Sequence, residues 1–267
     1  MSPLKALIFA VDGTLSETAE VHRTACNAAF HAFSLGFSWD PELYRELMVV
    51  SGGRERIEYY LKTYSPPGAD EALARLDEIY KFKSDRYLKL LDNQTARLRS
   101  GVERLVSEAR VAGVKLAIAT TTSLSNVEAL LMACLDFEGL NAFDVIVTGD
   151  MVAHKKPAPD VYKEVLRRLK LPAQSCLALE DSAIGLTAAT AAGLRTIITP
   201  SLYTRGQDFT GAFAVLSSLG DPFDPYEHLA GVGEDDRIVS IANLNRWMAD
   251  DDDIRALLTI GGRPVGS

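Results

Sequence analysis

Short apolar runs alternate with helical patterns along most of this chain, and this alternation is the feature that most restricts its fold. The runs cover residues 4–10, 114–119, 144–148, 176–180 and 194–199, and helical spacing of apolar residues covers 101–112, 127–135, 160–169 and 184–192. Buried strands that alternate with helices form a mainly parallel sheet with helices on both faces. We therefore predict a doubly wound, Rossmann-like α/β core, in which ligands bind where the strands end.

The stretch between the first and second strands is too long for a simple crossover and contains no strand-like run. Helical spacing covers residues 19–33, 41–50, 54–64 and 71–91, with breaks at 52–53 and 65–68. We predict an all-helical cap domain of residues 16–98, inserted into a core made of 1–15 and 99–220. Residues 221–267 are a C-terminal extension with a linker at 221–225, a possible helix at 238–248 and a solvated acidic run at 250–253.

The composition restricts the partners of the chain. Its formal net charge of −8 repels nucleic acid and anionic membranes. Cys26, Cys134 and Cys176 are odd in number, far apart and set in apolar stretches, which is typical of reduced thiols in a cytosolic protein. No apolar run is long enough to span a bilayer, and no leader-like pattern precedes the first strand. We expect a cytoplasmic monomer or weak homo-oligomer that binds a small molecule.

Polar residues follow four of the predicted strands, at the rim of the sheet where ligands gather. They are Asp12-Gly13-Thr14, Thr120-Thr121-Thr122, Lys155-Lys156-Pro157 and Glu180-Asp181-Ser182. Taken singly, these segments are a turn, a strand end, a solvated pair and a helix N-cap. Because all four lie at strand ends of one rim, we favour a functional site.

Together the rim residues match what phosphoryl transfer requires, namely a cation, hydrogen-bond donors and a positioned acid or base. Asp181, with Glu180 acting through water, offers hard oxygen ligands for a magnesium ion. Lys156 offers a fixed positive charge, and Thr120 offers a hydroxyl donor. Asp12 is placed to protonate the leaving oxygen and then to activate water. The nucleophile is the part that is missing.

These motifs resemble those of the haloacid dehalogenase superfamily of hydrolases over residues 4–213. That family has Asp-x-Asp-Gly-Thr after its first strand, a Ser or Thr after the second, a Lys before a helix and an acidic pair after the fourth. The resemblance implies that the first carboxylate forms an aspartyl-phosphate and ligates magnesium with the Asp12 backbone carbonyl. Ala10 stands at the position of that carboxylate. We therefore expect negligible turnover. Because every other rim residue is present, we favour inactivation by engineering over a natural non-catalytic relative.

The predicted cap is similar to the small helical cap of phosphoglycolate phosphatase, beta-phosphoglucomutase and, most closely, the CbbY-type xylulose-1,5-bisphosphate phosphatases. The segments that carry this similarity are 17–23, 39–40, 52–57, 83–87, 119–123, 126–130, 149–152, 203–204 and 209–212. The resemblance implies magnesium-dependent removal of a phosphate from xylulose-1,5-bisphosphate, an inhibitory by-product of rubisco. A mutase, a phosphoglycolate phosphatase and a sugar-phosphate-binding protein without turnover are the alternatives.

A bisphosphate has two anionic ends, and the rim holds one of them. The resemblance implies that Arg54, Arg56 and Lys83 bind the other phosphate from the cap. Gly53 favours this interpretation, because a glycine lets backbone N–H groups approach an oxyanion. Solvation on a helix surface is an equally good explanation of each basic residue taken singly. Arg54 also departs from the family, which has lysine there, and so does Ser100, which replaces a proline.

The remaining substrate contacts are expected near the hinge of the cap and at the end of the second strand. The resemblance implies that Glu17 and His22 contact sugar hydroxyls or gate Asp12. Thr121 and Thr122 extend the donor group that begins at Thr120. For His22, a plain surface histidine is the alternative.

Overall fold

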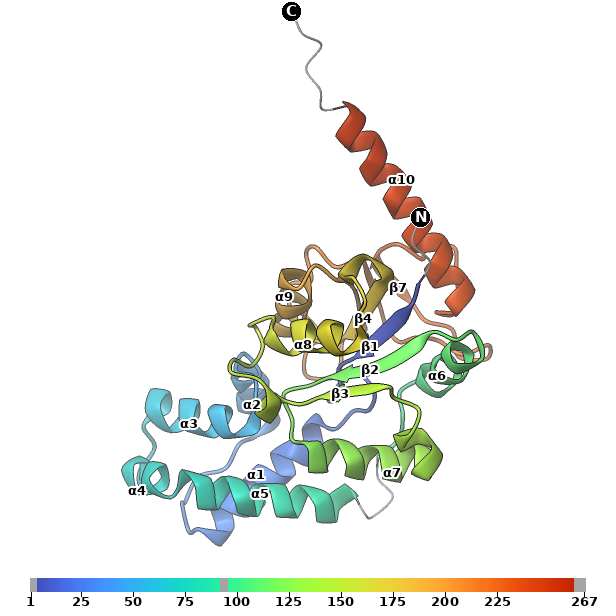
Figure 1. Ribbon diagram of the computed structural model, residues 1–267. Coiled ribbons are helices and arrows are strands. Elements are labelled where there is room, and N and C mark those ends of the chain that lie inside the picture. Colours follow the sequence, from blue (N-terminus) through green and yellow to red (C-terminus); the bar gives the residue numbers. More distant parts are fainter. Residues whose placement is uncertain (1–3, 92–95, 262–267) are drawn as a thin grey trace, which may run out of the picture.

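The computed structural model of the chain describes residues 4–91 and 96–261. Within these ranges the strands form a seven-stranded sheet in the order β3-β2-β1-β4-β5-β6-β7 (Figure 1). The strands are β1 (Ala6–Phe9), β2 (Lys115–Ala119), β3 (Val145–Val147), β4 (Cys176–Glu180), β5 (Arg195–Ile198), β6 (Ala214–Leu216) and β7 (His228–Gly231). Neighbouring strands are parallel except β6 and β7, which are antiparallel. The predicted mainly parallel α/β sheet is confirmed.

Both faces of the sheet are covered by helices, because alternate residues of each strand point to opposite faces. In β1, Leu7 and Phe9 join one apolar cluster, while Ala6 and Ile8 join another. The first cluster includes side chains of α6 (Val102–Val111), α7 (Leu124–Leu140) and α10 (Ile241–Gly261). The second includes side chains of α8 (Asp160–Leu169) and α9 (Ala183–Ala191). Short 3-10 helices, Gly149–Met151 and Ala173–Ser175, precede α8 and β4. The core is therefore doubly wound.

The insert after β1 is helical, as predicted. Its helices are α1 (Ala19–Ala32), α2 (Pro41–Leu47), α3 (Gly53–Tyr64), α4 (Ala69–Ala74) and α5 (Leu76–Leu91), which lie together at one end of the molecule (Figure 1). They enclose an apolar cluster of their own, with Phe30, Trp39 and Tyr60 among its members. The expectation of one helix over 71–91 was wrong, because the backbone leaves the helical conformation at Arg75, where the N–H bonds to Ala72 O.

The two linkers that join the cap to the core run side by side. Ser16 and Leu98 form an isolated antiparallel bridge, and Ser16 Oγ donates to Arg97 O at 2.7 Å. The backbone N–H of Arg99 donates to Leu15 O at 2.9 Å. The cap therefore enters and leaves the core at one point, which is the geometry of a hinge.

The segment after residue 220 joins the core rather than trailing from it. Sequence patterns missed β6 and β7, since β6 has three residues and β7 is largely exposed. The helix expected at 238–248 begins at Ile241 and continues to Gly261. Part of the acidic run at 250–253 is not simply solvated, because Asp251 and Asp252 pair with Arg195 of β5. A strand residue thus holds α10 against the sheet.

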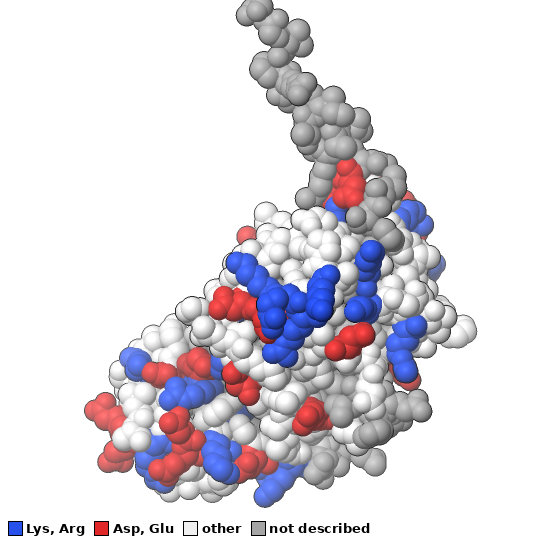
Figure 2. Space-filling view, in the orientation of Figure 1, with Lys and Arg blue, Asp and Glu red and all other residues white. Residues whose placement is uncertain are grey.

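Across residues 4–91 and 96–261, no helix has both the length and the apolar character needed to cross a membrane. Acidic and basic side chains are interspersed over the cap in Figure 2. Some of them form ion pairs one helical turn apart, such as Lys62 with Glu58 and Lys81 with Asp85.

Candidate active site

The rim residues meet the cap around one cavity. From the core, it is lined by Ala10, Asp12, Thr120, Thr121, Thr122, Lys156, Glu180 and Asp181. From the cap, it is lined by His22, Gly53, Arg56 and Lys83. The structure therefore brings together most of the residues that sequence patterns singled out, although they come from segments up to 171 residues apart, from Ala10 to Asp181.

Glu180 and Lys156 form a buried pair at the floor of the cavity. Oε1 of Glu180 accepts from Lys156 Nζ and from the Tyr162 hydroxyl, the latter at 2.6 Å. Its Oε2 accepts from the Asp181 N–H at 3.2 Å and from Ser182 Oγ at 3.4 Å. Both oxygens of Glu180 are engaged, and its Oε1 holds Lys156 in place.

Asp181 is the carboxylate best placed to hold a cation. It is 5% exposed, and burial beside the Glu180 carboxylate raises its pKa to about 7. Thr204 Oγ1 donates to its Oδ2 at 3.3 Å. A buried carboxyl whose ionised form is destabilised in this way gains from a nearby divalent ion.

The donor set fits magnesium in its chemistry, because carboxylate and carbonyl oxygens are hard ligands. Gly13 leaves room for Asp181, since a Cβ at Gly13 would overlap the Asp181 carboxylate. Ala10 is 5% exposed and contributes a methyl group to this part of the cavity. Among the described residues, no group of three or more His, Cys, Asp or Glu side chains is arranged to hold a metal ion.

A chain of polar contacts leads from the cap to Asp12. Lys83 Nζ lies 2.7 Å from His22 Nδ1, and His22 Nε2 lies 3.0 Å from Asp12 Oδ1. Thr18 Oγ1 donates to the same carboxylate oxygen at 2.5 Å. Burial opposes ionisation of Asp12, but His22, Thr18 and Lys83 together hold its pKa below the usual range. Asp12 is therefore ionised at neutral pH.

His22 is neutral at neutral pH. Burial, followed by the charge of Lys83, lowers its pKa to about 4. Its ring stacks on Tyr87 with the ring centroids 4.0 Å apart. These contacts place His22 inside the cap–core junction rather than on the surface.

Arg56 and Arg54 lie two residues apart in α3 and have different surroundings. Arg56 lines the cavity and donates to Tyr44 Oη at 2.9 Å and Val50 O at 3.0 Å. Arg54 is absent from the cavity lining and donates to Asp77 at 2.7 Å and Glu58 at 3.2 Å. In this structure Arg54 has the surface role that was the alternative to phosphate binding.

Glu17 is also absent from the cavity lining. Its Oε1 lies 3.4 Å from Arg99 Nε, and its Oε2 accepts from the Leu202 N–H at 3.3 Å. Glu17 therefore contacts the hinge and a core loop, not the space where a sugar would bind.

Several residues of the site were not predicted. Ser51 and Tyr80 line the cavity from the cap, and Ser51 Oγ donates to Thr121 Oγ1 at 3.0 Å across the cap–core gap. Lys155 Nζ and Glu55 Oε1 form a second bridge across that gap at 2.6 Å. Arg99 was overlooked as well. Its position could have indicated a role near the site, because Arg99 directly follows the predicted cap and a linker residue there lies near the rim.

The protein has a doubly wound core, a rim that carries cationic and acid–base groups, and a cap that covers this rim. These features together define the class of protein: it is a phosphatase. The chain belongs to the haloacid dehalogenase-like hydrolases, since the model of that family matches residues 7–199.

Known proteins resemble this chain closely. Protein CbbY of Cereibacter sphaeroides is 46% identical over 218 residues, which cover 82% of this chain and 94% of that protein. The crystal structure of CbbY from Rhodobacter sphaeroides with phosphate has a TM-score of 0.74 and 45% identity, and covers 80% of this chain and 94% of that one. A variant of that CbbY in complex with xylulose-(1,5)bisphosphate has a TM-score of 0.74 and 44% identity over the same shares.

Proposed function

We propose that this chain is a sugar-phosphate phosphatase scaffold of the CbbY type that binds xylulose-1,5-bisphosphate with magnesium but does not turn it over. The observation that carries this proposal is one cavity that Ala10 lines together with cations from both the core and the cap. Lys156 comes from the core, while Arg56 and Lys83 come from the cap. Cations from two parts of the chain suit a substrate with two phosphates. The solved complex of a related CbbY with xylulose-(1,5)bisphosphate supports this choice of substrate.

The roles of the core residues follow from their contacts. Thr120 Oγ1 accepts from the Thr122 N–H at 3.2 Å, so its own hydroxyl proton is free to be donated to a phosphate oxygen. Lys156, held by Glu180 and by Ala119 O at 2.9 Å, keeps a fixed charge beside the same phosphate. Magnesium, when bound by Asp181 and the backbone carbonyl of Asp12, would neutralise phosphate charge.

Asp12 would handle the protons of the reaction. Its ionised state suits the step in which a base activates water. His22 and Thr18 orient its carboxylate, which keeps it in place while the cap is closed.

Ala10 stops the reaction at binding. Phosphoryl transfer in this family needs an oxygen nucleophile on the side of the phosphate opposite the leaving group, and a methyl group has no lone pair to offer. We infer that the cavity retains substrate, since the cations that line it together with Ala10 are in place.

The Ala10→Asp variant tests the proposal. We expect this variant to release inorganic phosphate from xylulose-1,5-bisphosphate in the presence of Mg²⁺, while the chain with Ala10 binds the same compound without releasing phosphate. Glucose-1-phosphate and phosphoglycolate are the comparison substrates. Equal phosphate release by the two chains would contradict the role given to Ala10.

Two other functions share this rim and cap. Conversion of a sugar phosphate into its isomer by the Ala10→Asp variant, without net phosphate release, would indicate a mutase. Preference for phosphoglycolate would indicate a phosphoglycolate phosphatase. If the Ala10→Asp variant binds sugar bisphosphate and remains inactive on all three compounds, the chain is a natural binding protein.

A further inference from the structure

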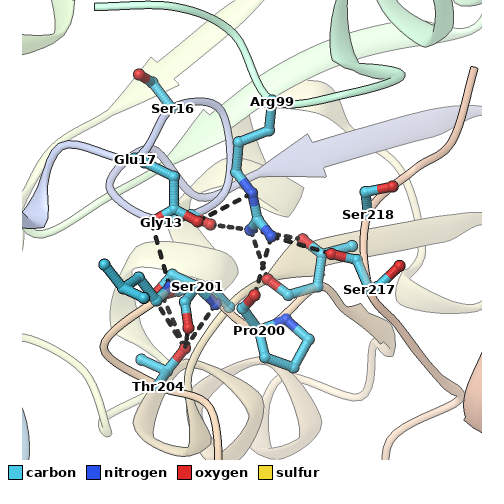
Figure 3. A network of polar contacts seen from close by, with 12 residues as sticks. Gly13, Ser16, Glu17, Arg99, Pro200, Ser201, Thr204, Ser217 and Ser218 are labelled. Carbon is cyan, nitrogen blue, oxygen red and sulfur yellow. Dashed lines mark hydrogen bonds and ion pairs between the residues drawn. The ribbon is translucent and has the colours of Figure 1, made fainter. Parts of the chain in front are cut away.

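Arg99 stands where the cap returns to the core, and its guanidinium points toward the loops that contain Gly13, Pro200 and Ser217 (Figure 3). Its side chain is 9% exposed. Nη1 donates to Gly13 O and to Thr199 O, the latter at 2.6 Å, and Nη2 donates to Pro200 O at 2.9 Å and Ser217 O at 3.2 Å. One side chain therefore contacts a set of backbone carbonyls that converge on it.

These carbonyls belong to loops that follow different strands. Gly13 follows β1, Thr199 and Pro200 follow β5, and Ser217 follows β6. The N–H groups of Thr199 and Ser217 still bond to Glu180 O and Glu227 O, whereas their carbonyls accept from Arg99. Buried carbonyls need a donor, and Arg99 supplies it here. A planar guanidinium with several N–H groups suits this task better than any other side chain.

The Gly13 loop carries the chemistry of the site. Asp12 is the residue before Gly13, and the Asp181 carboxylate packs so closely on Gly13 that a Cβ there would overlap it. A shift of the Gly13 carbonyl would therefore move the Asp12 backbone and the space that Asp181 occupies. Arg99 fixes that carbonyl relative to the β5 and β6 loops.

Arg99 also contacts the segment that leads into the cap. Its Nε lies 3.4 Å from Glu17 Oε1 in the outgoing linker, and its backbone N–H bonds to Leu15 O. The carbonyl contacts at Gly13, Thr199 and Ser217 lie on the core side. Arg99 is thus anchored to the core, while Glu17 connects the first cap linker to it.

We propose that Arg99 is a positioning residue, which holds the loop of Asp12 and Gly13 in the geometry that binds phosphate and magnesium while the cap moves about the hinge. The expected effect of Arg99 on kcat rests on the proposed function, whereas its expected effect on phosphate binding does not. Arg99 touches neither the cavity nor a reacting atom, so its effect passes through the Gly13 loop.

Arg99→Met and Arg99→Lys, made in the Ala10 chain and in the Ala10→Asp variant, test this proposal. In both backgrounds the dissociation constant of inorganic phosphate is measured by calorimetry at fixed Mg²⁺. We expect Arg99→Met to weaken phosphate binding about tenfold and to lower the kcat of the Ala10→Asp variant by about 10- to 100-fold, as misplacement of a catalytic loop does. Arg99→Lys should recover part of both losses, because it keeps the charge and some of the donors.

Arg104 offers a matched control. It lies in α6 and also donates to backbone carbonyls, namely Leu219 O at 3.2 Å, Gly220 O at 2.6 Å and Val239 O at 3.0 Å. It does not line the cavity. Arg104→Met should lower the Tm as Arg99→Met does, yet leave phosphate affinity and kcat within about twofold of the parent, since its carbonyl partners are absent from the cavity lining.

Each outcome decides the proposal. If Arg99→Met lowers the Tm but leaves phosphate affinity and kcat at the Arg104→Met level, Arg99 is merely structural and the proposal is overturned. If Arg99→Met does not fold, the Arg99→Lys variant tests the proposal instead. Phosphate affinity and kcat equal to those of the parent in Arg99→Lys would then overturn it. If the Ala10→Asp variant shows no turnover, the proposed function fails, while phosphate binding still tests Arg99.

Discussion

Lys83 Nζ lies 2.7 Å from His22 Nδ1, and the opposite ring nitrogen of His22 lies 3.0 Å from Asp12 Oδ1. An ammonium group only donates hydrogen bonds, so Nδ1 accepts and Nε2 carries the proton that His22 donates to Asp12. Lys83 belongs to α5 of the cap and Asp12 to the rim. The cap therefore sets the tautomer of the histidine that contacts the proton-handling carboxylate.

Removal of Lys83 should raise the pKa of His22. Burial is the larger cause of the present value of about 4, and the charge of Lys83 is the next. In Lys83→Met the pKa of His22 should therefore rise but stay below its ordinary value of about 6.5. NMR titration of the His22 ring measures this. Lys81→Met, which removes an exposed lysine from the same helix, should leave the His22 pKa unchanged, and equal shifts in both variants would argue against the contact.

Arg56 and Arg54 should differ in their effect on binding. Arg56 lines the cavity, so Arg56→Met should weaken binding of xylulose-1,5-bisphosphate by about 10- to 100-fold, which is the range for loss of a charged hydrogen bond. Arg54→Met should leave the affinity within about twofold, because its partners Asp77 and Glu58 are surface carboxylates. Calorimetry with the Ala10 chain measures both. A comparable loss in Arg54→Met would return Arg54 to the phosphate site.

The stability of the metal-free chain should depend on the protonation of Asp181. Its folded-state pKa of about 7 lies above the usual 3.8, so the folded state holds this proton more tightly than the unfolded state. The resulting stabilisation is complete below the unfolded pKa and is lost as pH rises toward and through 7. Between pH 5.5 and 7.5 it falls by about 2 kcal/mol.

Urea unfolding in EDTA at pH 5.5 and 7.5 checks this dependence, with Asp181→Asn as the control that cannot titrate. The loss of stability between the two pH values should be larger in the parent than in Asp181→Asn. Magnesium should raise the Tm of the parent more at pH 7.5 than at 5.5, because the cation competes with that proton. Identical pH profiles in parent and Asp181→Asn would contradict the assignment.

Alanine substitutions at Gly13 and Gly36 distinguish the effect of backbone strain from the effect of overlap with the site. Both have positive φ, 75° and 67°, so an alanine at either position is strained by the backbone. At Gly36 a Cβ meets nothing within 4 Å, whereas at Gly13 it overlaps Asp181. We expect each variant to lose about 1 kcal/mol or more of unfolding free energy. Gly13→Ala should in addition lose measurable phosphate binding in calorimetry, while Gly36→Ala should retain it.

Much of the architecture was readable from local patterns. The apolar runs that became β1, β2, β3, β4 and β5 were predicted within a few residues, because burial on both faces requires a continuous apolar segment. The rim motifs at Asp12, Thr120 and Asp181 directly follow those runs, and Lys156 lies between the third run and the helix after it, so their convergence followed from the parallel topology. The helical nature of the cap followed from its spacing and from the absence of strand-like runs.

Other features depend on which distant segments pack together. Arg54 and Arg56 are two residues apart, and the orientation of α3 against α5 and the rim determines which of them faces the cavity. Glu17 contacts Arg99 and Leu202 because the hinge folds back on the core. The short strand β6 is stabilised by its neighbours rather than by its own three residues.

The residues at the strand ends and Ala10 among them were therefore readable from sequence alone, because local burial and strand direction place them. The tertiary structure alone decided that Arg99 gathers the carbonyls of Gly13, Thr199, Pro200 and Ser217. Those partners lie up to 118 residues away along the chain, and no local pattern specifies which buried cation will satisfy carbonyls left unpaired at the ends of separate strands.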